Sequence, residues 1–401
     1  MHAEDIQIIN EELNLECNNT LPPTTFKEIL EYLDKIRFRK QSNKAENRND
    51  QAEIDAKDMA FFLIQARLLQ DQVQALMIRN KVCENVIILI TENTKAIEIL
   101  FLTDLVRQLV ELLGTDMQFG DVTFDHINAL KCFGVFGTNE QRIKLFELGV
   151  PRAIFKYLKS QDEKVSEVTA ALIAKCIFGV WTTTEEDEYI YINQTPYNCR
   201  PFPCFDQLQQ DGVTQAIQDD GFLNQKNGGT KQQSAEALGY IYTSRTLPEI
   251  LKTQLITYLR ESALSNDSDN IRGSAKALRA LAHDKVNDEE IKNGDFIWHL
   301  IEKAKNLTMG KSYRNNDAYD SIKKLVEAHN QEMSEYIYEK ERDDTTQIPL
   351  LSHSRSPEEL VHSLKLMKDD QETRRERIWS NISHQTYNQQ ILHRGLDRDE
   401  L

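Results

Sequence analysis

The residues that could carry catalysis or bind a cofactor do not combine into a complete motif. Gly310-Lys311-Ser312 has the last three residues of a phosphate-binding loop, but the first glycine of that motif should stand where Lys305 is. Cys199 and Cys204 are spaced as some zinc ligands are, but no second pair of Cys or His lies near them in the sequence. The sequence therefore predicts no nucleotide, cofactor or metal site.

The carboxylates and histidines also lack a catalytic spacing. Asp219-Asp220 and Asp369-Asp370 are pairs of adjacent residues, so their side chains would point apart on a helix instead of forming an acid-base pair. The nine histidines are dispersed. The sequence has no His-Glu-x-x-His metal motif and no Gly-x-Ser-x-Gly nucleophile turn. We therefore expect a protein that is not an enzyme.

The composition of the whole chain indicates long helices. The 401 residues include 48 Lys and Arg against 64 Asp and Glu, which gives a net charge of −16. There are only 15 glycines and 9 prolines, so long stretches contain no residue that breaks a helix. The negative charge argues against a nucleic-acid-binding protein or a polybasic membrane anchor, because both need an excess of Lys and Arg.

The N-terminal residues and the cysteines favour a reducing compartment. The start of the chain has no secretory pattern, and the apolar stretches are far shorter than the roughly 20 residues of a membrane span. We therefore expect no membrane insertion and a location in the cytoplasm, with the nucleus as a second compartment. Cys132 and Cys176 lie in apolar helical patterns and are expected to be small buried residues.

Short apolar patterns recur at a nearly constant spacing. Ala129-Leu130 returns 42 residues later as Ala171-Leu172, and Ser234–Leu238 returns 40 residues later as Ser274–Leu278. A period of this length is typical of solenoids whose repeats have two or three helices. Alanine at a helix crossing lets the two backbones approach closely, and the adjoining leucine fills the contact. The sequence therefore predicts stacked helical repeats.

A turn before the last helix of a unit identifies the kind of repeat. In Leu148-Gly149-Val150-Pro151, glycine can adopt a positive φ and proline favours the first helical turn. Together with Ala129-Leu130 before it and residues Ile154–Leu158 after it, this pattern resembles the armadillo repeat. Asp295–Ile301 looks like another last helix, with Asp295 where the repeat usually has glycine. The resemblance covers about residues 85–306, and HEAT repeats and an irregular helical bundle remain alternatives.

The resemblance implies an all-α fold, a right-handed α-α superhelix of armadillo-like repeats. We expect an acidic N-terminal segment at 1–52, with one helix that Thr24 or Thr25 caps and that ends near Arg39, followed by a polar linker. The repeat domain is expected at 53–340, with residues 317–340 as a terminal helix. Residues 341–401 are expected to be a charged, partly disordered tail with a possible amphipathic helix.

One irregular inserted loop is expected at about 182–211. This segment holds three of the nine prolines, six acids and one arginine, with aromatic residues among them. A glycine turn resembling that at Gly149 recurs at Gly212, 63 residues on, so about 21 residues are inserted. Long loops are usually functional or disordered, and both alternatives stay open. In the functional alternative an acidic-aromatic arm contacts a partner through Tyr189, Tyr191, Tyr197 and Phe202.

The armadillo resemblance implies a concave groove that holds a partner segment, lined in our prediction by the last helix of each unit. The repeat alignment places two sets of residues at equivalent groove positions: Arg107, Arg152 and Trp298, and then Glu111, Lys156 and Glu302. Arg and Trp are frequent anchors of protein interfaces. Trp298 equally fits the core, and Arg152 equally fits a solvated surface.

Nuclear import adaptors are the best-known armadillo proteins, and this chain lacks their signature. They bind basic signals through a Trp and, four residues later, an Asn, repeated along one series of helices. The Trp positions correspond in this chain to Lys131, Ile173, Gly239 and Arg279, and the Asn positions to Val135, Ile177, Thr243 and His283. None matches, which argues against this function.

The sequence thus favours a non-catalytic intracellular scaffold or adaptor that binds another protein. The charge of −16 suggests a basic segment in that partner. A regulatory or structural subunit of a larger assembly, or a role carried by the inserted arm, are the alternatives. The sequence does not indicate an oligomeric state.

Overall fold

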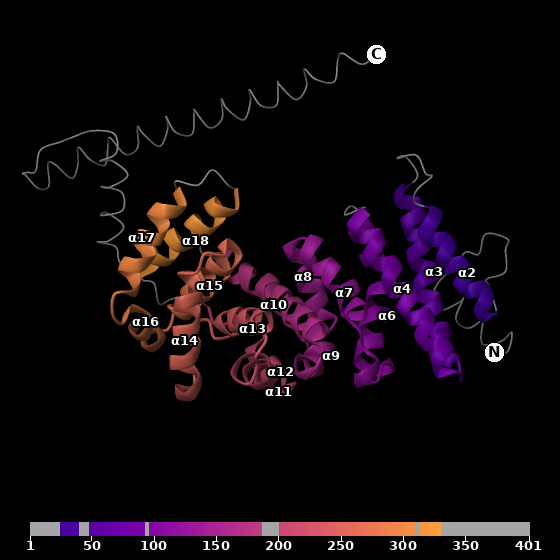
Figure 1. The fold of residues 1–401 in the computed structure, drawn as a ribbon, viewed down its shortest axis with the longest axis horizontal. Coiled ribbons are helices and arrows are strands. Elements are labelled where there is room, and N and C mark those ends of the chain that lie inside the picture. The colour runs from indigo at the N-terminus through magenta and orange to yellow at the C-terminus, as the bar shows by residue number, and fades with distance from the viewer. Residues whose placement is uncertain (1–24, 40–47, 93–95, 187–199, 309–312, 330–401) are drawn as a thin grey trace, which may run out of the picture. The chain divides into compact units, whose positions relative to one another are not determined.

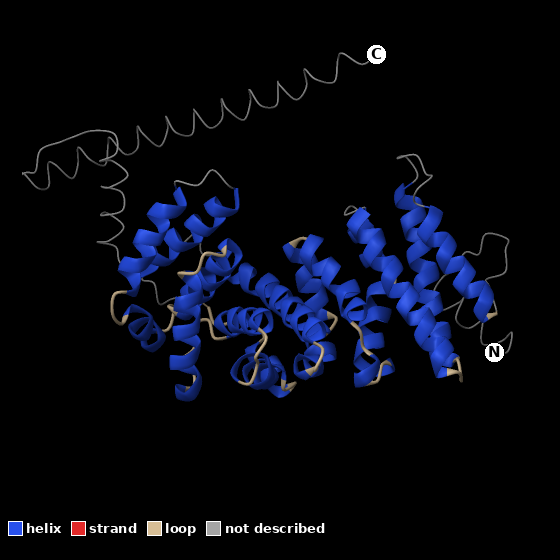
Figure 2. Ribbon diagram, viewed as in Figure 1, coloured by secondary structure: helices blue, strands red, loops and turns tan. Residues whose placement is uncertain are grey.

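The computed structural model describes residues 25–39, 48–92, 96–186, 200–308 and 313–329. The chain divides into two compact units, Met1–Ile337 and Tyr338–Leu401, and the second unit, which includes the whole of the expected tail, lies outside the described residues. Within the described ranges the secondary structure is helical, with no strand (Figure 2).

Helices α2 (Phe26–Arg39) and α3 (Arg48–Leu68) precede the first repeat. Thr25 caps α2 as expected: its hydroxyl accepts a hydrogen bond from the Glu28 amide at 3.3 Å, and its own amide donates to the Glu28 carboxylate at 3.1 Å. Helix α3 begins at Arg48, inside the segment expected to be a linker, because Ala52 and Ala56 already pack into the core.

The repeats follow a common plan of a long helix, then a short helix, then a third helix. The first repeat consists of α4 (Gln72–Glu92), α5 (Ala96–Leu102) and α6 (Leu105–Glu111) with its π-helical continuation η2 (Leu112–Asp116). A short 3-10 turn, η3 (Phe119–Asp121), leads to the second repeat, which consists of α7 (Phe124–Phe136), α8 (Asn139–Glu147) and α9 (Val150–Ile154) with η4 (Phe155–Lys159).

The next group is α10 (Glu163–Glu186), α11 (Phe205–Gln210) and α12 (Val213–Ala216) with the π-helical η6 (Ile217–Leu223). Then come α13 (Gly228–Ile241) and α14 (Glu249–Ala263), between which residues 242–248 form turns instead of a short helix. The last group is α15 (Ser268–Leu281), α16 (Lys285–Lys292) and α17 (Phe296–Thr308), and α18 (Tyr313–His329) follows it. Ile322, Leu325 and Val326 of α18 are buried, as the apolar face of the expected terminal helix.

The long helices α4, α7, α10, α13, α15 and α18 form a ladder in which each contacts the next (Figure 1). The predicted Ala-Leu pairs lie along it, and Leu130, Leu172, Leu238 and Leu278 are all fully buried. The helices approach so closely that a Cβ on Gly239 of α13 would lie 2.6 Å from the Cβ of Ala277 of α15. The 40-residue period therefore reflects helices that stack side by side.

Left-handed glycines mark the start of the third helix in three repeats. Gly149, Gly212 and Gly294 have φ of 79°, 75° and 75°, a region that residues with a Cβ rarely adopt. The alignment was therefore wrong in giving this role to Asp295, since Gly294, one residue earlier, makes the turn. The buried positions of α17 still follow the predicted register, with Phe296 and Leu300 matching Val150 and Ile154 of α9.

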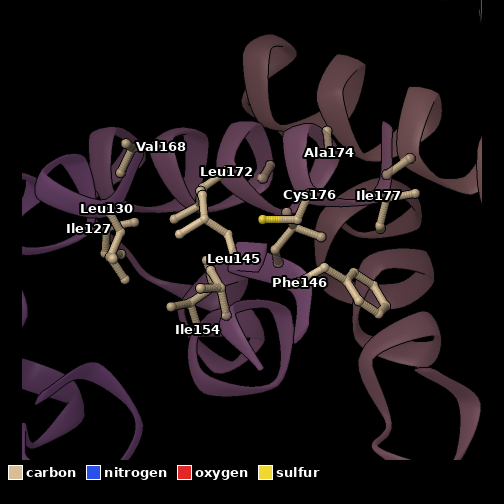
Figure 3. Packing of buried hydrophobic residues seen from close by; sticks show 14 of the residues in the cluster. Ile127, Leu130, Leu145, Phe146, Ile154, Val168, Leu172, Ala174, Cys176 and Ile177 are labelled. Atoms are coloured by element: carbon tan, nitrogen blue, oxygen red, sulfur yellow. The ribbon is translucent and has the colours of Figure 1, made fainter. Parts of the chain in front are cut away.

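The core runs continuously between the ladder and the other helices. Around α10, all three helices of one repeat meet the first helix of the next (Figure 3). The buried residues at this point include Ile127, Leu130, Leu145, Phe146, Ile154, Leu172 and Cys176. Each fully buried Leu or Ile contributes about 1.5–3 kcal/mol to folding. Cys132 and Cys176 are both buried, which confirms the prediction for these two thiols.

Helix α10 is long and apolar enough to cross a membrane between Glu163 and Thr183, but 78% of that segment is buried inside the structure. It contacts α7, α8, α9 and α13, so its apolar residues serve the core of the solenoid.

The expected inserted loop is shorter than the sequence suggested. Helix α10 continues to Glu186, and Phe205–Gln210 form α11, so both ends of segment 182–211 contain helix. Phe202 is 1% exposed and its ring lies 6.4 Å from that of Phe146, so it belongs to the core and not to a partner-binding arm. Tyr189, Tyr191 and Tyr197 lie outside the described residues.

Candidate partner-binding surface

Arg107 and Glu111 of α6 are held by ion pairs within their own part of the solenoid. The Arg107 guanidinium lies 2.6 Å from Asp104 and 3.0 Å from Glu111. Its hydrogen bond to Asp104 raises the pKa of Arg107. Glu111 also pairs with Arg67 of α3 at 2.8 Å. These charges therefore already have partners, and Glu111 joins the first repeat to the helix before it.

Lys156 and Arg152 belong to the next repeat and have different roles. The Lys156 ammonium donates a hydrogen bond to the carbonyl of Gly114 at 3.0 Å, which ties η4 to the middle of η2. Burial lowers the pKa of this half-buried lysine. Beside it, the Tyr157 hydroxyl donates to the Leu113 carbonyl at 2.7 Å. Arg152 is exposed.

The third pair of predicted residues is remote from the first two. Trp298 and Glu302 lie on α17, which packs against α16 and α18, whereas α6 and α9 contact each other. The side chains of Trp298 and Glu302 lie outside the described part of the structure. The structure thus brings together the residues of α6 and α9, and there Glu111 and Lys156 contact the elements that precede their own repeats.

A second surface lies on the ladder, where each long helix leaves one stripe of side chains open. On α10 the partly exposed positions Ala171, Lys175 and Phe178 follow one another at helical spacing, and on α15 so do Arg272, Lys276 and Arg279. The remaining sides of these helices are covered by their neighbours. We call the surface formed by these stripes on α10, α13 and α15 the ladder face.

Three cations lie near one carboxylate on the ladder face. The carboxylate is Glu236 of α13, and Lys175, Arg272 and Lys276 lie close enough for their charges to act on it. We call these four residues the cationic cluster. The Gln232 amide donates to the Glu236 carboxylate at 2.8 Å. A Cβ at Gly273 would overlap this carboxylate, so glycine at that position leaves the space that Glu236 occupies against α15.

Burial weakens the charges that meet in the cationic cluster. It raises the pKa of Glu236 to about 7, although Gln232 and the three cations act in the opposite direction. Burial likewise lowers the pKa of Lys175, with Arg142 of α8 and Arg272 acting in the same direction and Glu236 in the opposite one. Glu236 is therefore only partly ionised near neutral pH, and Asp269 is a second carboxylate whose charge acts on Lys175.

Aromatic rings lie directly beside the cationic cluster. The rings of Trp181 and Tyr240 are 4.6 Å apart, and Phe178 packs 5.5 Å from Tyr240. The Lys276 ammonium lies 5.1 Å from the centre of the Phe178 ring, and the Arg279 guanidinium lies 5.7 Å from the centre of the Trp181 ring. Trp181 and Tyr240 are buried, whereas Phe178 is half-buried and offers an apolar contact at the surface.

A polar network anchors this region from below. Gln232, buried in α13, donates to Ser274 of α15 at 2.9 Å and accepts from Ser262 of α14 at 2.7 Å. The same residue lines an open cavity of about 310 Å³, together with Tyr258, Ser262 and Asn270. Gln232 therefore holds three helices and the Glu236 carboxylate in fixed positions.

The described ranges contain no group of three His, Cys, Asp or Glu residues that could hold a metal ion. The cations of the cationic cluster are charged hydrogen-bond donors, which suit an anionic group. The cluster contains no nucleophile and no paired acid and base that would indicate catalysis. Sequence reasoning missed this cluster. A usable signal was nevertheless present in the two repeated pentapeptides, whose central residues are Glu236 and Lys276, opposite charges at equivalent positions of helices that stack side by side.

Comparison with known proteins finds similarity only among solved structures. No protein-family model and no curated protein matches the chain. A designed armadillo repeat protein is 16% identical over 67% of this chain and 98% of its own, with a TM-score of 0.44. Another, solved in complex with the peptide (KR)4, is 16% identical over 67% of this chain and 98% of its own, with a TM-score of 0.41.

An engineered protein of a structural genomics programme is 15% identical over 76% of this chain and 70% of its own, with a TM-score of 0.45. These are structures to which the chain is similar at low identity. On the evidence of its own three-helix groups, helix ladder and left-handed glycines, the described part of the chain is an α-solenoid of armadillo-like repeats.

Proposed function

We propose that this protein is a non-catalytic scaffold or adaptor that binds another protein on the ladder face of its solenoid. The observation that carries this proposal is the cationic cluster with its adjoining aromatic rings, to which three successive long helices contribute. Arg is enriched among residues that dominate binding energy, and Arg272 and Arg279 are partly exposed on α15. The buried rings of Trp181 and Tyr240 support the half-buried Phe178, which is the aromatic side chain that a partner can reach.

The preference for the ladder face over the third helices has a physical reason. Arg107, Glu111 and Lys156 already make ion pairs or hydrogen bonds that join neighbouring elements of the solenoid. A partner that used Glu111 or Lys156 would disturb contacts between neighbouring elements of the solenoid. The cations of the ladder face have partners as well, but the ion pair of Arg272 with Asp269 lies within one helix. Among the described residues that were predicted to line the groove, Arg152 is exposed, and a partner reaches it without disturbing those contacts between elements. Trp298 and Glu302 remain candidates because of their position on α17.

The charge of the whole chain supports long-range attraction of basic proteins. At −16, the chain would accelerate encounters with a basic partner, and this steering would weaken as salt is added. The (KR)4 complex shows that one designed armadillo protein binds a basic peptide. A location in the cytoplasm, with the nucleus as a second compartment, is part of the proposal.

A second candidate function, a structural subunit of a larger assembly, is favoured by exposed apolar residues near the turn between α3 and α4. Leu68 is 52% exposed and Val73 is 69% exposed, and Met77 lies one helical turn beyond Val73. Contiguous exposed apolar side chains often mark contacts between subunits. In that case Val73→Ser with Met77→Ser would release the chain from the assembly, whereas changes on the ladder face would not.

The proposed function is tested by capture of partners from cell lysate with three proteins. These are the wild type, Arg272→Glu with Lys276→Glu on the ladder face, and Arg152→Glu with Lys159→Glu on α9 and η4 as the control with the same change of charge. Circular dichroism establishes that all three keep their helices. A partner lost only with the ladder variant supports the proposal, whereas a partner retained by that variant contradicts it.

A further inference from the structure

We infer that the segment bound on the ladder face is an acidic peptide segment of the partner protein, whose carboxylates contact Lys175, Arg272 and Lys276 and which places one aromatic or aliphatic side chain on Phe178. This inference rests on the proposed function, because it names the chemistry of the partner at the same surface. The net charge of the whole chain suggests a basic partner, whereas the cations next to the proposed binding site favour an acidic segment.

Among the described residues of the ladder face, cations outnumber carboxylates, whereas acids outnumber cations over the chain as a whole. With Arg142 and Arg279 at its edges, the cationic cluster presents five cations, and the described carboxylates beside them are Glu236 and Asp269. Asp269 lies in the first turn of α15, where it also favours the helix dipole, and pairs with Arg272 at 2.9 Å. Because screening at physiological salt acts over about 8 Å, a bound segment responds mainly to these nearby charges.

Glu236 shows which group the cluster accommodates. Its carboxylate sits against α15 in the space left by Gly273 and accepts a hydrogen bond from Gln232. A carboxylate from a partner would meet the same three cations from the open side. Lysine and arginine give charge-assisted hydrogen bonds to carboxylates, which are stronger than neutral ones.

The spacing of the helices sets the length of the segment. Lys175 and Lys276 come from α10 and α15, which are separated in the ladder by α13. Packed helices lie about 8–10 Å apart, so a segment that crosses all three covers about 16–20 Å between the outer axes. An extended chain advances about 3.3 Å per residue, so about five or six residues span the cluster. Phe178, half-buried under the Lys276 ammonium, provides the adjoining apolar contact.

The test uses the full chain and fluorescein-labelled ten-residue peptides in an anisotropy titration. One peptide alternates Asp and Glu around a central Phe, a second has Lys and Arg in the same places, and a third has Ser and Gln. We expect the acidic peptide to bind most tightly. We expect Lys175→Glu with Lys276→Glu to weaken its binding at least tenfold, and Lys27→Glu with Lys57→Glu on α2 and α3, which changes the net charge equally, to change it less than twofold.

Neutral variants keep the inference testable if charge reversal unfolds the ladder. Lys175→Gln with Lys276→Gln should weaken the acidic peptide at least threefold, while circular dichroism stays unchanged. Tighter binding of the basic peptide than of the acidic one overturns the inference but leaves the proposed protein-binding function standing. Binding of none of the peptides, or equal losses in the ladder and control variants, also overturns it. The proposed function fails separately, when the lysate capture finds no partner that depends on the ladder face.

Discussion

Acid should destabilise this protein through His126, the third residue of α7. Its side chain is fully buried, and its Nδ1 accepts a hydrogen bond from the Thr123 amide at 3.0 Å. Burial lowers the pKa of His126 from 6.5 to about 4, and the Arg79 charge acts in the same direction. Because Nδ1 is the acceptor, the neutral ring carries its hydrogen on Nε2, which is buried with no hydrogen-bond partner among the described residues. Acid therefore adds a proton at Nδ1 and removes the acceptor of the Thr123 amide.

The sign and size of the effect follow from proton linkage. Because the pKa is lower in the folded state, the unfolded chain binds more protons between pH 4 and pH 6.5, and stability falls as the pH decreases through that range. Between pH 7.5 and pH 5 the loss from His126 amounts to about 2 kcal/mol.

His126→Gln is a conservative control variant, because the next helix already uses glutamine in the same position. The Gln141 side chain accepts from the Thr138 amide at 2.8 Å and closes the corresponding cap of α8. The variant therefore keeps the cap and removes the titration.

Urea unfolding at pH 7.5 and pH 5 gives the free energy of unfolding of both proteins. Because repeat arrays can unfold in parts, hydrogen exchange of the peptide covering α7 is measured as well. We expect the wild type to lose about 2 kcal/mol more than the variant between the two pH values. Equal losses in both proteins would refute the reasoning.

Three further predictions concern contacts between repeats and the ladder face. Gly239→Ala should cost about 1–3 kcal/mol in urea unfolding, because the new methyl group overlaps α15, whereas Gly228→Ala in the same helix, with open space around it, should cost nothing measurable. Tyr157→Phe should lower the free energy of unfolding by about 0.5–1.5 kcal/mol through loss of its hydrogen bond to the preceding repeat, and an unchanged value would contradict that role. The affinity for the acidic peptide should fall between pH 6 and pH 8, because Glu236, whose pKa is raised, ionises in that range. Glu236→Gln should remove this pH dependence in the anisotropy titration, and a pH dependence that persists in the variant would argue against its assignment to Glu236.

The repeat organisation was readable from the sequence because it depends on residues that are locally constrained. The Ala-Leu pairs must be small and apolar to fit the ladder, and Gly149 must adopt a positive φ. Both requirements leave a pattern in the sequence. The sequence predicts the third turn at Asp295, one residue too late. The apolar residues of α17 match those of α9, but one additional residue separates Gly294 from the start of the helix.

The candidate surface was not readable in the same way, because charge and exposure depend on neighbours far away in sequence. Lys156 looks like a solvated side chain until the stacked repeats place the Gly114 carbonyl, 42 residues earlier, beside its ammonium group. Glu236 looks like one of many acids until the ladder places Lys175, 61 residues earlier, beside it. Phe202 stands among prolines and acids, and only the packing of α8 shows that it is core.

The two hydrogen bonds that η4 makes to the preceding repeat have the same direction along the chain. Lys156 and Tyr157 donate to carbonyls of Gly114 and Leu113, which are already part of the preceding repeat. During synthesis the N-terminal repeat leaves the ribosome first, and its carbonyl groups are in place before the donors of the next repeat emerge. At this junction the completed first repeat thus acts as a template for the second, so these two repeats can assemble in the order in which they are translated.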